Sequence, residues 1–184
     1  MGISSIRIVI LGLMLALLGW GCGSKKSYYV PPPADTTVDI KYRFTPTLDP
    51  TSLSYVYIPP DLDSALDELD RILTPAFREE LKAVPPKDMT LYRGQLGLWI
   101  KNKWGLWSAS PLRSYFKMRG LNHADDMSAL ILDAYWCHLQ GSSPDLPALE
   151  KYYQIKRSCI DSLTRRATDI QPIPDLPRPE SFCK

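Results

Sequence analysis

A histidine and two carboxylates lie close together at the start of a predicted helix. His123 is followed at short spacing by Asp125 and Asp126, and an imidazole beside a carboxylate can exchange protons with a substrate near neutral pH. These residues would suit a hydrolase-type enzyme. The structural alternative is helix capping, in which one aspartate accepts backbone N–H groups and the other interacts with the helix dipole. Successive helical residues diverge by about 100°, which disfavours both carboxylates facing one site.

Aromatic side chains are concentrated just before this histidine. Three of the five tryptophans, Trp99, Trp104 and Trp107, fall within nine residues. They could form a stacking platform for a sugar or a peptide, or they could pin a loop to a small core. If part of this cluster is exposed, Tyr115 and Phe116 would add further aromatic anchors for a partner.

Two polar residues fall on predicted helix faces that are otherwise apolar. Asn102 shares its side of the helix with Leu91 and Leu98, so we expect a buried amide that ties the helix end to the following W-G-L-W loop. We include Asn102 with the three tryptophans as a candidate binding residue. Lys156 is expected either to reach solvent or to pair with a carboxylate.

Other familiar kinds of site lack their sequence markers. His123 and His138 are 15 positions apart, which matches no zinc spacing, so no metal site is predicted. His138 is expected to be a hydrogen-bonded core histidine. Neither a Gly-rich phosphate loop, nor a G-x-S-x-G elbow, nor a C-x-x-C motif occurs, and no cofactor is expected. The formal charge of +2 includes Arg7, and this near-neutrality gives no argument for nucleic-acid binding.

The N-terminus has the pattern of a bacterial lipoprotein signal. Arg7 is the only charge ahead of an apolar run over residues 8–18, which ends in small residues before Cys22. The run is shorter than the roughly 20 residues of a membrane-spanning helix. We therefore expect cleavage before Cys22, a diacylglyceryl group on its thiol, and a second acyl chain such as palmitate that makes the attachment to the membrane durable.

One feature of the cleavage site departs from the usual lipoprotein pattern. The leucine normally three residues before the cysteine is here Leu18, four residues before it, with the bulky Trp20 between them. The alternative is therefore a secreted protein that is cleaved conventionally near Cys22. The expected location is the cell envelope. Gly23 follows Cys22, rather than an aspartate that would retain the chain at the inner membrane, so we favour the outer membrane.

Composition divides the chain into four parts. Residues 1–21 form the signal, and residues 22–60 form a lipidated, Pro-rich spacer. The spacer contains a possible hairpin, because residues 38–44 alternate apolar and polar and a second short run covers residues 55–58. Residues 61–167 form a single helical domain, and the Pro-rich residues 168–184 are expected to be largely unstructured.

The fold class is mainly α, a small bundle of five to six helices. Apolar spacing, the pairs Thr74-Pro75 and Ser110-Pro111, and Gly120 and Gly141 indicate where helices begin and end. The helix that starts near Ala124 is apolar on both sides, so it should be central to the domain. The expected helices cover residues 61–73, 74–84, 88–103, 110–120, 124–140 and 145–167.

Three cysteines remain beyond the signal. Cys137, Cys159 and Cys183 permit one disulfide and one leftover thiol in an oxidising compartment. A bridge between Cys137 and Cys159 would join two packed helices. Free, buried thiols are the alternative.

Three motifs together are similar to a family. W-I-K-N-K-W-G-L-W, L-R-S-Y-F and H-A-D-D-M-S-A-L-I-L resemble a bacterial domain of unknown function, over about residues 62–155. This chain has Lys101 where the family typically has Arg, Ala124 where it has Pro, and Arg93 where it has His. The resemblance implies no activity, and an arginine at position 93 could not act as a base. We therefore expect a non-enzymatic lipoprotein that binds a protein or a cell-wall partner.

Overall fold

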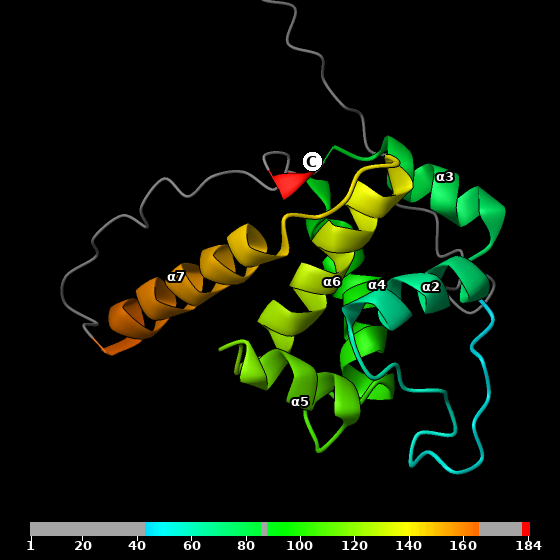
Figure 1. Cartoon of the computed structure of the whole chain (residues 1–184), viewed down its shortest axis with the longest axis horizontal. Coiled ribbons are helices and arrows are strands. Elements are labelled where there is room, and N and C mark those ends of the chain that lie inside the picture. The colour runs from blue at the N-terminus through cyan, green and yellow to red at the C-terminus, as the bar shows by residue number, and fades with distance from the viewer. Residues whose placement is uncertain (1–42, 86–87, 166–181) are drawn as a thin grey trace, which may run out of the picture. The chain divides into compact units, whose positions relative to one another are not determined.

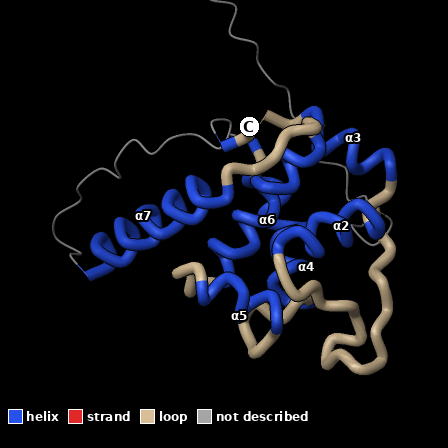
Figure 2. Tube along the Cα trace, viewed as in Figure 1, coloured by secondary structure: helices blue, strands red, loops and turns tan. Residues whose placement is uncertain are grey.

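Six helices account for most of the computed structural model, which describes residues 43–85, 88–165 and 182–184, without the side chains of residues 163 and 165. No strand forms within these residues (Figure 2). The prediction of a mainly α domain with up to six helices is therefore confirmed. In chain order the helices are α2 (Leu62–Ile72), α3 (Pro75–Ala83), α4 (Thr90–Lys103), α5 (Pro111–Met118), α6 (Ala124–Leu139) and α7 (Leu146–Arg165).

The predicted signal peptide and lipidation site lie outside the described residues. The same holds for the first part of the predicted spacer, residues 22–42, and for residues 166–181 of the predicted tail. None of the described helices has both the length and the hydropathy needed to cross a membrane.

Side-chain caps fix where three of the helices begin. The carboxylate of Asp61 accepts the Ser64 backbone N–H at 2.9 Å, and this bond starts α2. Thr74 and Ser110 cap α3 and α5 in the same way, each followed by a proline in the first turn. A proline has no N–H to lose at this position, and a hydroxyl satisfies an N–H that the helix leaves free. The Thr-Pro and Ser-Pro pairs thus predicted these two starts correctly.

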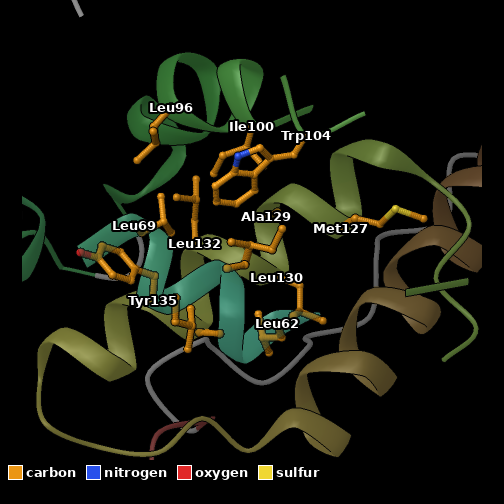
Figure 3. Packing of buried hydrophobic residues seen from close by; sticks show 14 of the residues in the cluster. Leu62, Leu69, Leu96, Ile100, Trp104, Met127, Ala129, Leu130, Leu132 and Tyr135 are labelled. Carbon is orange, nitrogen blue, oxygen red and sulfur yellow. The ribbon is translucent and has the colours of Figure 1, made fainter. Parts of the chain in front are cut away.

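Helix α6 is the central element of the domain (Figure 1). It contacts each of the other five helices, and nearly every side chain along it is buried, including Met127, Leu130 and Ile131. Figure 3 shows Ala129, Leu130 and Leu132 of α6 among leucines from α2 and the side chains of Ile100 and Trp104 at the end of α4. The prediction that a helix apolar on both sides lies at the centre is confirmed.

The described segment before α2, from residue 43 onward, packs on the core. Phe44 is buried and pairs with Leu73 in an isolated bridge, while Val56 pairs with Leu48. Residues 38–42 of the first predicted arm lie outside the described residues, and the described Phe44 pairs with Leu73 and not with residues 55–58. The ring of Phe44 packs edge-on against Trp99 at 4.8 Å, and this burial draws the segment toward the helices. The domain thus begins before residue 61.

A disulfide attaches the C-terminus to α6. Cys137 is bonded to Cys183, and Cys159 is the free thiol. Of the two possibilities left open by the sequence, neither the Cys137–Cys159 bridge nor a set of free thiols describes Cys137. The Phe182 ring is buried against Tyr152 at 5.5 Å, and the Lys184 backbone exchanges hydrogen bonds with Ser143. The prediction of an unstructured tail is therefore wrong for residues 182–184. A covalent bond and a buried aromatic ring provide contacts that a Pro-rich composition does not reveal.

We predict that the Cys137–Cys183 disulfide contributes strongly to the stability of the domain. It closes a loop over a sequence separation of 46 residues, and a constraint of that length lowers the entropy of the unfolded chain. Cys183→Ser should lower the free energy of unfolding by about 2–4 kcal/mol in urea denaturation. Cys159→Ser is the matched control, because it removes a thiol without removing a bond. Equal midpoints for the two variants would contradict the prediction.

Candidate functional site

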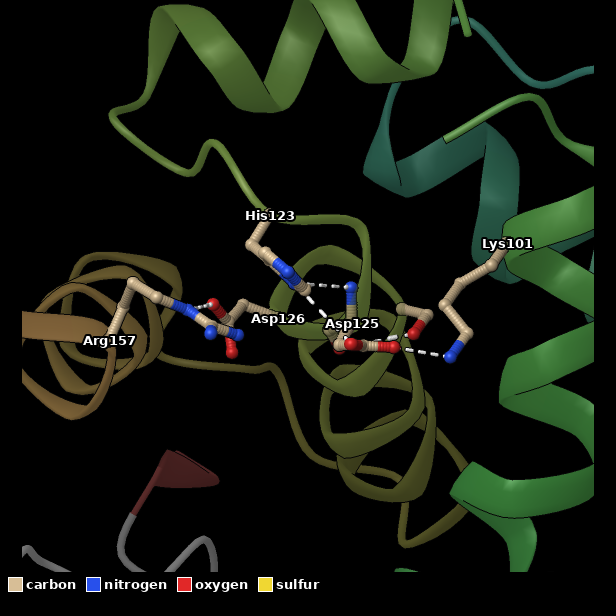
Figure 4. A network of polar contacts seen from close by, with 6 residues as sticks. Lys101, His123, Asp125, Asp126 and Arg157 are labelled. Carbon is tan, nitrogen blue, oxygen red and sulfur yellow. Dashed lines mark hydrogen bonds and ion pairs between the residues drawn. The ribbon is translucent and has the colours of Figure 1, made fainter. Parts of the chain in front are cut away.

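The predicted acid/base residues surround the N-terminus of α6, but the two carboxylates do not converge on one site: Asp125 Oδ2 lies 3.4 Å from His123 Nδ1, whereas Asp126 is turned toward Arg157. His123 is the N-cap residue, and its Nδ1 accepts the Asp125 backbone N–H at 3.3 Å. The two carboxylates leave opposite sides of α6 (Figure 4). Asp125 pairs with Lys101 on α4, and Asp126 accepts a hydrogen bond from Arg157 Nε on α7 at 2.6 Å. The geometry therefore joins α6 to two neighbouring helices.

In each of these ion pairs, a contact with the partner favours the charged form of a side chain. Burial raises the pKa of Asp125, but the hydrogen bond and the positive charge of Lys101 outweigh it, so the pKa lies below its ordinary value. The hydrogen bond to Asp126 raises the pKa of Arg157. His123 does cap the helix, a role that the sequence had suggested for one of the aspartates. An imidazole nitrogen that accepts a backbone N–H is engaged as a cap and is poorly placed to act as a base.

The aromatic cluster divides into core and surface residues. Trp104 is fully buried, and its ring packs edge-on against Trp99 at 5.9 Å, which in turn contacts Phe44. Trp107 is 52% exposed and lies near Lys101, whose Nζ is 5.8 Å from the ring centroid. Of the three tryptophans, Trp107 is the one with a largely exposed side chain, and the other two hold the W-G-L-W loop against the core.

Two further aromatic residues were expected to add anchors next to the tryptophans. Phe116 is fully buried, and Tyr115 is half-buried with the Arg119 guanidinium 4.4 Å from its ring centroid. Both rings therefore contribute mainly to packing between α5 and its neighbours.

Asn102 is exposed, contrary to its predicted burial. The buried face of α4 carries Tyr92, Leu96 and Ile100, which is the side opposite Asn102, while Leu91 and Leu98 are also exposed. Leucines occur on both sides of this helix, so the apolar pattern is compatible with two buried faces. The prediction from sequence placed the wrong one in the core.

Asn102 instead lines a cleft between two segments that are far apart in the sequence. The cleft has a volume of about 590 Å³ and is bounded by residues 49–58 on one side and by the end of α4 and the start of α5 on the other. Ser54 Oγ donates a hydrogen bond to the Lys103 carbonyl at 2.7 Å, which joins the two sides. Gly105 has a φ of +66°, and a Cβ there would lie 3.1 Å from Ser110, so the loop needs glycine at this position.

A buried polar cluster that the sequence did not predict lies between α4, α6 and α7. Asp133 accepts a hydrogen bond from Arg93 Nη2 at 2.6 Å and another from the Tyr153 hydroxyl at 2.5 Å. Burial raises the pKa of Asp133, and the Arg93 charge opposes this rise. The partly buried Lys156 has its Nζ 5.3 Å from the Tyr153 ring centroid, and its pKa is lowered by burial and by Arg93. Because Arg93, Asp133 and Tyr153 bond to one another from three different helices, the arrangement is suited to holding those helices together.

The other histidine, His138, pairs with a carboxylate that the sequence did not identify as its partner. His138 Nε2 lies 2.6 Å from Asp70 Oδ2, and the Tyr135 hydroxyl donates to Asp70 Oδ1 at 2.9 Å. Burial raises the pKa of Asp70, but these hydrogen bonds and the nearby Arg78 bring it below its ordinary value. His138 is hydrogen-bonded as predicted, but at 38% exposure of its side chain it is not a core residue. Neither His138 nor Asp70 lines the cleft described above.

The described residues form a small all-α domain with polar ties between helices and a cleft at the side where residues 49–58 face residues 102–111. Residues 58–139, which run from just before α2 to the end of α6, match the family model of a domain of unknown function, DUF6794. The expected domain of unknown function is thus found, and helix α7 lies outside the match. No curated protein and no solved structure matches the chain. Within the described residues, no group of three or more histidine, cysteine, aspartate or glutamate side chains could hold a metal ion.

We predict that Asp126 stabilises the domain through Arg157. The Asp126 side chain is 7% exposed, so Asp126→Ala would leave the Arg157 charge partly buried without its partner. The free energy of unfolding should fall by about 1–3 kcal/mol, and a double-mutant cycle with Arg157→Ala should show that the two residues are coupled.

Asp125→Ala is the matched control for this prediction. Its carboxylate is 49% exposed, although its partner Lys101 is 13% exposed, and an ion pair whose carboxylate is screened by water contributes about 1 kcal/mol or less. Equal losses of stability in the two alanine variants, or no coupling between Asp126 and Arg157, would contradict the prediction.

Proposed function

We propose that this chain is a non-enzymatic lipoprotein of the bacterial cell envelope whose helical domain binds a protein or cell-wall partner. One observation carries the proposal. The side chains that could have formed an acid/base site are occupied in ties between helices, whereas polar side chains without partners gather at an open cleft. A ligand site combines an accessible concave surface with a few polar groups that orient the ligand, and the cleft supplies both.

The alternative is a hydrolase-type enzyme that uses His123 with Asp125 or Asp126. It would require a carboxylate that orients the imidazole while a nitrogen of that ring faces a substrate. Asp126 is turned away toward Arg157, and the Nδ1 of His123 accepts a backbone N–H. Asp125 Oδ2 lies 3.4 Å from that same Nδ1, but the carboxylate is paired with Lys101. These contacts favour the binding function.

Attachment to the membrane through Cys22 is the part of the proposal that rests on the sequence alone. The signal-like residues 1–21 and the small residue before Cys22 support it. A chain with two or more acyl groups on one cysteine would stay with the membrane, since each buried methylene contributes about 0.8 kcal/mol.

We predict that Cys22→Ser abolishes acylation of the chain and with it the lipid anchor. The wild-type chain should fractionate with envelopes and partition into detergent, and the intact mass of its extracted N-terminus should include acyl groups. The variant should appear in the soluble envelope fraction or remain as an uncleaved precursor, in either case without acyl mass. An unacylated N-terminus in the wild-type protein would refute the anchor.

We also predict that a partner is contacted from one side of the domain. A photoreactive residue placed at Asn102 or Trp107 should crosslink to an envelope component in intact cells. The matched control is the same residue at Glu79, which is exposed on α3. Crosslinks of equal yield from all three positions would indicate nonspecific contact, and the absence of crosslinks at Asn102 and Trp107 would count against a binding function of this surface.

A further inference from the structure

Three polar side chains of the cleft have no partner within the described part of the chain. These are the phenol of Tyr57, the amide of Asn102 and the ammonium group of Lys103, and all three line the same cavity. They come from both sides of the cleft, Tyr57 from the segment before α2 and the other two from the end of α4. A phenol and an amide can each donate and accept hydrogen bonds, and an ammonium group donates up to three.

We propose that this cleft binds an acetamido-bearing glycan strand. The inference rests on the proposed binding function and names the class of partner. An acetamido sugar presents an amide and several hydroxyl groups along its edges and apolar C–H groups on its ring face. The Asn102 amide and the Tyr57 hydroxyl match those edges, and the Tyr57 ring offers a surface for the apolar face.

The other polar side chains of the cleft are already engaged, and they fix its shape. Thr51 donates a hydrogen bond to Asp49 at 2.7 Å, and Ser54 donates to the Lys103 carbonyl. Ser110 accepts the Arg113 backbone N–H at 3.1 Å. Because these bonds exist without a ligand, less conformational freedom remains to be lost when a ligand binds.

The charge and size of the cleft are compatible with a neutral ligand of moderate size. Asp49 and Lys103 are the charged residues of its lining and have opposite signs, so the cleft has no net charge to attract a polyanion. Its volume of about 590 Å³ falls within the roughly 300–1,000 Å³ of ligand pockets. The cleft is therefore large enough for part of a sugar chain.

A peptide is less well matched to the cleft than a glycan. Peptides commonly bind by adding a strand to a sheet edge or by placing apolar side chains in a groove. The described residues form no strand to which a peptide could add. The two large aliphatic side chains at the cleft are Leu53 and Ile58, and Leu53 is 98% exposed, so it does not enclose an apolar pocket. Most of the lining residues carry hydroxyl, amide or small side chains, and Leu53, Ile58 and Pro111 add apolar surface. Such a mixed lining suits a sugar ring, which has hydroxyl groups at its edges and apolar faces.

Binding of soluble sugar oligomers to the purified full chain tests the proposal. We expect a tetramer of N-acetylglucosamine to bind in calorimetry, and purified peptidoglycan sacculi to co-sediment with the protein. Asn102→Ala and Tyr57→Phe should each weaken the affinity for the tetramer by about three- to tenfold, because each removes a hydrogen bond to a neutral group. Neither variant should change the thermal midpoint, since neither side chain has a partner within the described residues.

Two controls make the outcome decisive. Asn122→Ala removes an exposed amide that does not line the cleft, and it should leave the affinity for the tetramer unchanged. A glucose tetramer, which lacks acetamido groups, should bind at least tenfold more weakly than the N-acetylglucosamine tetramer. Equal binding of the two sugars, or affinity that is unaffected by Asn102→Ala and Tyr57→Phe, would overturn the assignment.

Failure of this inference can be distinguished from failure of the proposed function. If neither the sugar tetramer nor the sacculi bind, while photoreactive residues at Asn102 still crosslink to an envelope protein, the glycan is wrong and the binding function stands. If the crosslinks are absent as well, both proposals fail.

Discussion

The rest of the structure depends on the burial of α6 from every side. Its apolar side chains point in all directions around the helix, so it can be stable only when other elements cover its whole circumference. Each large aliphatic side chain that is fully buried contributes about 1.5–3 kcal/mol, and Leu130, Ile131 and Leu132 are all buried completely. Five helices contact α6 for this reason, and the short connections between them follow from the need to wrap around one axis.

Complete burial creates a second requirement, because α6 also carries polar side chains. A buried carboxylate without a partner is strongly destabilising, and both Asp126 and Asp133 are nearly inaccessible. Their partners, Arg157 for one and Arg93 with Tyr153 for the other, come from the helices that cover α6. The polar residues that looked most chemical in the sequence are thus explained by the position of their helix. Arg93 also fits this role, since a permanent cation suits a buried aspartate better than a titrating base does.

Local signals in the sequence predicted the helices well, and nonlocal features were predicted poorly. Caps such as Thr74 and Ser110 act within a few residues, so the sequence alone shows them. The partner of Cys137 lies 46 residues away, and proximity of that kind depends on the whole path of the chain. The prediction of the buried face of α4 was wrong for another reason. Leucines occur on both sides of this helix, and only packing against α6 decides which side is buried. Tertiary contact therefore overrode a pattern that was ambiguous by itself.

The cleft shows why a candidate site of this kind is hard to find from sequence. Asn102 was selected as a polar residue on an apolar face, and it proved to lie at the surface, where its amide is free. Nothing in the sequence marked Tyr57 as a candidate site residue, because the residues that face it across the cleft, 102–111, are far from it along the chain. What defines the site is a set of polar groups that the fold leaves unsatisfied. Burial without a partner would destabilise such groups, whereas exposure lets water satisfy them at little cost until a ligand replaces that water. An unsatisfied group is a property of the folded arrangement, so it can be recognised only after every internal partner has been assigned.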